Sequence, residues 1–173
     1  RAGIARTFQN IRLFGELSVE ENITVAMDTQ MHYTMPEGIF RLPRFWKEER
    51  VVHERAMELL SIFHMEDLAK AKANSLPYGA QRRLEILRAL ATNPSLLLLD
   101  EPAAGMNPSE TAELMENIRS IRDTFKIAVL LIEHDMNLVM NICEGIAVLN
   151  FGHVIAKGTP EDIQNNPEVI EAY

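Results

Sequence analysis

Two short apolar segments separated by one crossover-length stretch constrain the fold of this chain more than any other feature. Residues 95–99 read SLLLL and residues 127–132 read IAVLLI, with no charge in either segment. Strands that are apolar on both faces belong to parallel sheets covered by helices, and the stretch between these two is long enough for a helix. The sequence therefore predicts an α/β chain with a mainly parallel sheet and flanking helices. We expect the intervening helix to be capped by Ser109 and to end near Thr124.

The pattern continues on the C-terminal side with shorter elements. We predict a helix over residues 136–143 and a strand over 145–150. A shorter strand follows over 152–158, with a glycine at each end. A helix then starts after Thr159, which is followed by proline and two acids, and a last short helix starts at Asn166. Cys143 is the only cysteine, so it cannot form an internal disulfide, and we interpret it as a small core residue.

Residues 17–74 have a different, helical character. Residues 18–21 read SVEE, a capping box, and residues 47–63 predict an amphipathic helix in which Val51, Val52, Met57, Leu59, Leu60 and Phe63 are available to pack. Between these helices, residues 32–46 hold two prolines, a glycine and several aromatics and methionines that look exposed. We interpret 17–74 as an inserted helical subdomain whose middle loop, 32–46, is a candidate contact surface.

The apolar strand at 95–99 ends in two adjacent carboxylates, Asp100 and Glu101. Ligands bind at the carboxyl edge of open α/β sheets, and neighbouring carboxylates there repel each other unless a cation is present. One interpretation is that Asp100 holds Mg²⁺, directly or through water, while Glu101 acts as a general base. The alternative is that both acids cap a turn or lie in solvent.

Several segments resemble, in order, the motifs of the ATP-binding cassette family, the nucleotide-hydrolysing subunits of ABC transporters. Residues 96–101 resemble its Walker B strand, 76–83 (LPYGAQRR) its signature loop and 103–108 (AAGMNP) its D-loop. Residues 131–135 (LIEHD) resemble its switch-histidine segment and residues 6–10 (RTFQN) its Q-loop. The resemblance implies a P-loop NTPase fold of the ABC type, with a catalytic core of 1–16 and 75–173 and with 17–74 as the helical subdomain.

The resemblance assigns roles to individual residues. It implies Glu101, His134 and Gln9 as catalytic residues, and Asp100 with Gln9 as the metal site. Pro77, Tyr78, Gly79, Ala80, Gln81 and Asn107 are implied as nucleotide-binding positions, with ATP and Mg²⁺ as cofactors. A glycine turn that opens a helix offers backbone N–H groups to an anion. Here Pro77, Tyr78 and Ala80 replace the common Ser, Gly and Gln of the family, and Asn107 stands where the D-loop usually has Asp.

The sequence segments 6–14, 76–83, 103–108 and 158–173 are most similar to those of the ATPase subunits of bacterial branched-chain amino-acid importers. The resemblance therefore implies an ATPase subunit on the cytoplasmic, inner face of the cell membrane. Its expected partners are membrane permease subunits, which 17–74 would contact, and a second ATP-binding subunit in a homo- or heterodimer. Importers of amides or urea share such phrases and stay open as alternatives.

None of the eight glycines begins the Gly-x-x-x-x-Gly-Lys-Ser/Thr run of a P-loop. We expect that the P-loop precedes Arg1 in a longer protein and that these 173 residues alone do not hydrolyse ATP. A non-catalytic interaction module, and a soluble ABC-type ATPase acting on DNA or ribosomes, are the alternatives. The net charge of −8 speaks against nucleic acid as a partner.

Overall fold

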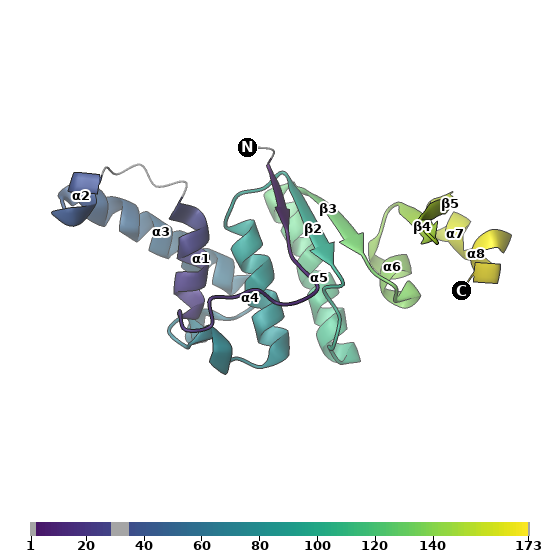
Figure 1. The fold of residues 1–173 in the computed structure, drawn as a ribbon, viewed down its shortest axis with the longest axis horizontal. Coiled ribbons are helices and arrows are strands. Elements are labelled where there is room, and N and C mark those ends of the chain that lie inside the picture. The colour runs from purple at the N-terminus through teal and green to yellow at the C-terminus, as the bar shows by residue number, and fades with distance from the viewer. Residues whose placement is uncertain (1–2, 29–34, 173) are drawn as a thin grey trace. The chain divides into compact units, whose positions relative to one another are not determined.

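A computed structural model describes residues 3–28 and 35–172 of the chain (Figure 1). The chain forms two compact units, Arg1–Ile132 and Glu133–Tyr173, and each is described by itself. Within the described residues, no helix has the length and apolar character that crossing a membrane requires.

The first unit contains the predicted parallel sheet. Its strands are β1 (Ile4–Arg6), β2 (Leu96–Asp100) and β3 (Ala128–Ile132), and their spatial order is β1-β2-β3. Both pairings are parallel, with Ile4 opposite Leu96 and Leu96 opposite Ala128. The central strand is apolar because it is covered: Leu97 and Leu99 are completely buried. The fold class predicted from the two apolar segments is therefore confirmed.

Strand β3 differs from the expectation of burial on both faces. Leu130 is 52% exposed and Ile132 is 50% exposed; both lie on the same face of β3, which is also an outer strand of the sheet. An apolar outer strand of this kind offers unpaired backbone groups and apolar side chains to another strand.

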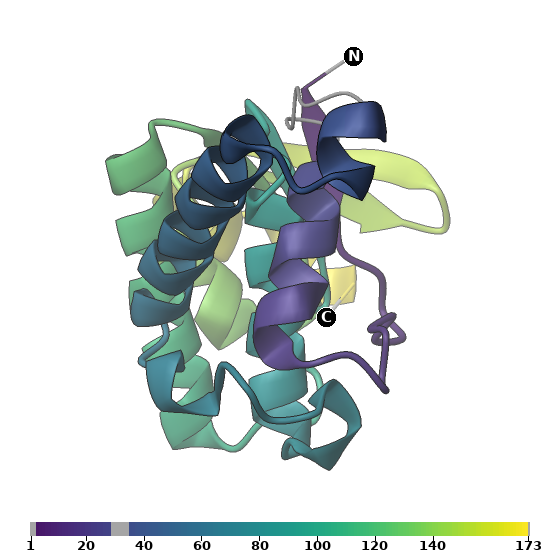
Figure 2. The same cartoon turned by 90° about the vertical axis from the view of Figure 1, so that its left-hand side faces the viewer.

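Helices make up the rest of the first unit. They are α1 (Val19–Met27), α2 (Met35–Ile39), α3 (Pro43–Ser61), the short η2 (Glu66–Leu68) and η3 (Ala73–Ser75), α4 (Tyr78–Leu90) and α5 (Pro108–Phe125). Figure 2 shows α1, α3 and α4 as neighbours, and α4 also packs against β1 and β2. Ser18 and Glu21 form the predicted capping box of α1.

The helix predicted over 47–63 begins four residues earlier, at Pro43, because proline suits the first turn of a helix. Leu59, Leu60 and Phe63 pack as expected, but Val51 is 57% exposed, so its predicted packing is wrong. The contact loop predicted over 32–46 lies partly outside the described residues. Within its described part, Phe40 is 74% exposed and Trp46 is 54% exposed, as expected.

The helix predicted after the carboxylates is present as α5, but its cap is Asn107 and not Ser109. The Asn107 side chain accepts the backbone N–H of Glu110 at 3.0 Å, and the Glu110 carboxylate accepts the backbone N–H of Asn107 at 3.0 Å. Because Pro108 occupies the first turn, the residue before it is the one that can cap the helix.

The second unit is a small antiparallel hairpin with helices. It comprises α6 (Met136–Ile142), β4 (Ile146–Asn150), β5 (His153–Gly158), α7 (Pro160–Gln164) and α8 (Pro167–Ala172). Strands β4 and β5 pair with each other, and β5 is the longer strand, contrary to the prediction. Thr159 caps α7 as predicted. The core of this unit consists of Val148, Ala156, Ile163 and Val169. Cys143 is half-buried, and this burial raises the pKa of its thiol.

Candidate functional site

The two predicted carboxylates lie where the central strand ends. Asp100 is the last residue of β2, and Glu101 follows it with a φ of 44°, in the left-handed region that side chains other than glycine rarely adopt. The backbone N–H of Glu101 donates to the Ile132 carbonyl at 2.9 Å, which holds this turn against the end of β3. A non-glycine residue in this conformation persists only where its surroundings fix it, and such positions gather at functional sites.

The two carboxylates contact side chains from the end of β1 and from the segment that follows it. Gln9 Nε2 donates to Glu101 Oε2 at 2.8 Å, and Arg6 NH2 donates to Asp100 Oδ2 at 2.9 Å. The Gln9 bond uses the amide NH2 group, so the carbonyl oxygen of Gln9 is not the atom engaged in it. The parallel pairing of β1 with β2 brings residues that are 92 and 94 positions apart in the sequence to one edge of the sheet.

A completely buried arginine holds the backbone around the carboxylates. Arg82 on α4 has no exposed surface. It donates to four backbone carbonyls from two separate segments: those of Phe8, Asp100, Glu101 and Pro102. The guanidinium of Arg82 therefore ties the segment after β1 to the turn after β2.

Glu85, one turn further along α4, neutralises this arginine. Glu85 Oε2 accepts from Arg82 NH1 at 2.7 Å, and the carboxylate side chain is only 3% exposed. Its other oxygen, Oε1, lies 3.5 Å from the backbone nitrogen of Phe8 and 3.4 Å from that of Arg12. A buried ion pair is favourable only when further hydrogen bonds satisfy both groups, and this pair meets that condition.

The predicted anion-binding turn lies at the start of α4. Pro77 is the N-cap and has no side-chain capping bond, so the first backbone N–H groups of the helix receive no cap from it. Gly79 is buried, and a Cβ there would meet Glu110 Oε1 at 3.2 Å. The ring of the half-exposed Tyr78 lies against Gly105, where a Cβ would be 3.2 Å from it. The structure thus brings residues 77–80 next to the turn that precedes α5.

Two of the predicted nucleotide-binding side chains have local partners. Gln81 Nε2 donates to the Leu76 carbonyl at 2.9 Å, and Asn107 caps α5. Both side chains therefore stabilise the turns next to the candidate site.

His134 lies two residues after the end of β3 and belongs to the second unit, which is described by itself. Its side chain is 75% exposed, and its backbone N–H donates to Glu133 Oε2 at 3.3 Å. The next residue, Asp135, caps α6 by accepting the backbone N–H groups of Asn137 and Leu138.

The donor chemistry at the end of β2 fits Mg²⁺. This ion prefers carboxylate and amide oxygens, and it commonly takes only one or two protein carboxylates while water and phosphate complete its shell. Asp100, Glu101 and Gln9 provide oxygens of these kinds at one edge of the sheet. Among the residues that the structure describes, no group of three or more His, Cys, Asp or Glu could hold a metal by itself.

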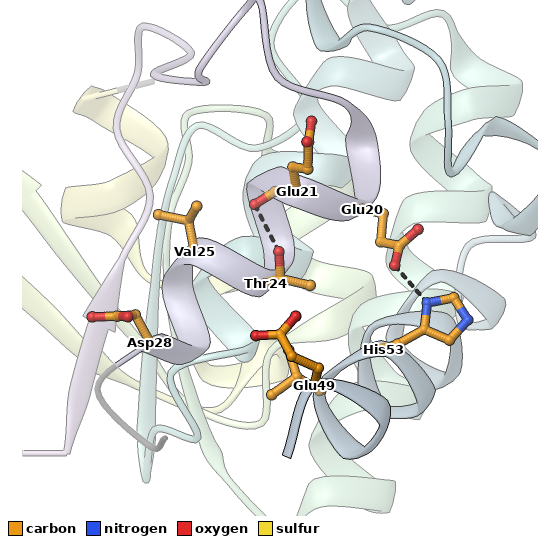
Figure 3. Close-up of a pocket in the computed structure, with 8 residues that line it drawn as sticks. Glu20, Glu21, Thr24, Val25, Asp28, Glu49 and His53 are labelled. Carbon is orange, nitrogen blue, oxygen red and sulfur yellow. Dashed lines mark hydrogen bonds and ion pairs between the residues drawn. The ribbon is translucent and has the colours of Figure 1, made fainter. Parts of the chain in front are cut away.

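A separate hollow of about 390 Å³ lies between α1 and α3 (Figure 3). Four of the eight residues that line it are acidic, and His53 Nδ1 pairs there with Glu20 Oε1 at 2.5 Å. None of the predicted site residues lines this hollow.

Sequence reasoning did not single out Arg6 or Glu85. The one available signal was the pairing of Arg82 and Glu85 at i and i+3 on the same helix. For Arg6, the contact with Asp100 arises from strand pairing, which a single sequence does not show.

A parallel sheet with acids at its carboxyl edge and a helix turn beside them is the arrangement of a nucleotide-binding α/β protein. The sequence profile of the family described as "ABC transporter" matches residues 1–104, and that of "Branched-chain amino acid ATP-binding cassette transporter" matches residues 153–173. The chain therefore belongs to the ABC transporter family, as one of its ATP-binding, ATP-hydrolysing subunits.

Two relatives with closely similar sequences are named as transport proteins. The high-affinity branched-chain amino acid transport ATP-binding protein BraF of Pseudomonas aeruginosa is 47% identical over 173 residues, which are 100% of this chain and 68% of that protein. The corresponding protein LivG of Escherichia coli has the same identity and coverage. A crystal structure of an ABC transporter ATP-binding cassette in its ADP conformation is 30% identical, with a TM-score of 0.78, over 99% of this chain and 68% of the other.

Proposed function

We propose that this chain forms part of the Mg²⁺-dependent ATPase that powers import of branched-chain amino acids. The observation that carries the ATPase role is the juxtaposition of two carboxylates at the end of β2 with Gln9 from the segment after β1. The substrate class rests on the two named relatives and on the family match at residues 153–173.

Each site residue has a chemical task in this proposal. Asp100 and Gln9 would hold Mg²⁺, whose charge stabilises the phosphate oxygens when it is bound. Glu101 accepts a proton from the attacking water, and the bond from Gln9 Nε2 orients its carboxylate. His134 hydrogen-bonds the phosphate or the attacking water. The backbone N–H groups at 78–81 face the phosphates of the ATP held by a second subunit, and Asn107 supports that loop.

The proposed assembly has two kinds of partner. A second ATP-binding subunit completes each nucleotide site, and membrane permease subunits contact residues 17–74 on the cytoplasmic face of the membrane. Exposed apolar side chains support a contact surface within this segment: Ile39 is 73% exposed, Phe40 is 74% exposed and Trp46 is 54% exposed. Apolar side chains grouped in this way are typical of protein interfaces.

ATP turnover by the transporter, assembled in vesicles with its permease subunits, tests the ATPase role. Removing a general base costs about 10²- to 10⁴-fold in rate, so Glu101→Gln should abolish turnover while ATP still binds. The matched control is Glu113→Gln, which neutralises a glutamate on α5 that pairs with Arg83. Turnover by Glu101→Gln within a few-fold of the wild type would contradict the proposal.

Uptake of labelled leucine or valine into the same vesicles tests the substrate class, with labelled urea and an aliphatic amide as competitors. The proposal predicts ATP-dependent uptake of the amino acids alone. Uptake of urea or the amide in their place would refute the substrate class and leave the ATPase role intact.

A further inference from the structure

We propose that Arg6 is the internal counter-ion of Asp100 and that Mg²⁺ must displace its guanidinium from this carboxylate to bind. The inference rests on the proposed function, because it concerns the metal that Asp100 holds there. It assigns to Arg6 a positioning role: it keeps the Asp100 carboxylate oriented and its charge balanced until the metal arrives.

The contact itself is direct. Arg6 NH2 lies 2.9 Å from Asp100 Oδ2, and the two side chains are 52% and 20% exposed. Arg6 stands opposite Leu98 in the parallel ladder, so Asp100 lies two residues further along the neighbouring strand, on the same face of the sheet. Two carboxylates in succession need a positive charge nearby, and Arg6 supplies it from the adjacent strand.

The guanidinium and the metal compete for the same carboxylate. Arg6 lies 2.9 Å from Asp100 Oδ2, and Mg²⁺ bound to either oxygen of this carboxylate would lie close to the guanidinium, where the two positive charges repel each other. Asp100 must therefore exchange one cation for the other. The side chain of Glu101 is held separately, by Gln9, so this exchange concerns Asp100 alone.

After it leaves Asp100, the Arg6 guanidinium can stay in contact with the ring of Phe8. The Arg6 guanidinium carbon lies 5.4 Å from the centroid of the Phe8 ring, within the range of a cation–π contact. The Arg12 guanidinium carbon lies 4.7 Å from the centroid of the same ring. Arg12 is not the arginine that is bonded to Asp100, so the ring can hold a guanidinium without that bond. Arg6 can therefore leave Asp100 without leaving this aromatic surface.

The strength of the pair is consistent with exchange. Ion pairs that are partly exposed contribute little to stability. Their contribution corresponds to a factor of about 1.5 to 5 in an equilibrium constant. A pair of this strength holds the carboxylate in place without preventing metal binding. A much stronger pair would exclude the metal.

The test is a titration of the full-length ATP-binding subunit, with ATP bound and with Mn²⁺ as a paramagnetic probe in place of Mg²⁺. Arg6→Gln should tighten Mn²⁺ binding by about 2- to 5-fold, because the metal no longer displaces a cation. Arg12→Gln is the matched control, since it removes the same charge from the same ring and leaves the Asp100 contact intact. Arg6→Lys keeps the charge and should stay close to the wild type.

Each outcome of the Mn²⁺ titration either supports or overturns the inference. Equal Mn²⁺ affinities of Arg6→Gln and Arg12→Gln would overturn the inference, and so would weaker binding by Arg6→Gln, which would make Arg6 a ligand of the nucleotide. If the wild-type subunit bound no Mn²⁺ with ATP, the proposed function itself would fail. A double-mutant cycle of Arg6→Gln with Asp100→Asn, measured on unfolding in EDTA, checks the contact without metal: strictly additive effects would contradict it.

Discussion

Replacing Arg82 by methionine should strongly destabilise the first unit. Methionine keeps most of the apolar stem of arginine and removes only the guanidinium. The variant leaves the Glu85 carboxylate, 3% exposed, without its ion-pair partner. Removing one member of a buried ion pair costs about 3–5 kcal/mol, because the other charge stays buried without compensation.

The structure separates two contributions to this loss. One is the unpaired charge of Glu85, and the other is the loss of the bonds from Arg82 to the carbonyls of Phe8, Asp100, Glu101 and Pro102. Adding Glu85→Gln to Arg82→Met removes the charge and should recover part of the stability. The loss that remains in the double variant is the contribution of the carbonyl contacts.

Urea unfolding followed by circular dichroism measures these differences. With a slope of about 2 kcal/mol per molar urea, Arg82→Met should lower the midpoint by about 1.5–2.5 M. The control is Arg83→Met, the adjacent arginine, which forms a partly exposed pair with Glu113 and should cost less than about 1 kcal/mol. If Arg82→Met and Arg83→Met unfolded at the same urea concentration, the assigned role of Arg82 would be wrong.

Three further predictions concern other parts of the fold. Asn107→Ala should lower stability by about 1 kcal/mol in thermal unfolding, because it removes the cap of α5, whereas Ser109→Ala should be nearly neutral. The Lys72 ammonium lowers the pKa of Glu16, so this pair contributes stability above pH 4.5 that is lost as the pH falls through the lowered pKa; Lys72→Met should flatten the acid side of the stability profile. The exposed apolar face of β3 should make the isolated 173-residue chain self-associate, and Ile132→Lys should reduce this association in size-exclusion chromatography.

Each of these predictions has an outcome that contradicts it. Equal melting temperatures of the variants at 107 and 109 would mean that the cap contributes nothing. An unchanged acid profile in Lys72→Met would show that Glu16 does not use the pair. A cleanly monomeric, cooperatively melting chain would contradict the prediction for β3.

Periodicity predicted the elements whose environment is local or uniform. The buried strand β2 and the capped helices α1 and α7 follow directly from apolar runs and from capping residues such as Ser18 and Thr159. The cap of α5 predicted at Ser109 is wrong, and Pro108 in the first turn points instead to the residue before it, Asn107. The exposure of β3 depends on which strand is outermost, and strand order is not written in local sequence.

In the candidate site, too, some features could be predicted from local sequence and others depend on tertiary packing. The position of Asp100 and Glu101 could be predicted, because a buried parallel strand that ends in two charges places them at the carboxyl edge of the sheet. The contacts that organise them could not, since Arg6 and Arg82 reach this edge only through tertiary packing. A buried arginine in particular runs against the usual expectation of exposure, and only its partners account for it.

The end of β2 is proposed to be a Mg²⁺-dependent ATP site, and calorimetric titration of the ATP-binding subunit with ATP tests this most directly. The titration compares the wild type with Asp100→Asn, each in the presence and absence of Mg²⁺. We expect Mg²⁺ to strengthen ATP binding by the wild type, and this gain to be lost in Asp100→Asn because the metal has lost its carboxylate ligand. An equal gain from Mg²⁺ in both proteins would show that the metal is held elsewhere and that Asp100 has been given the wrong role.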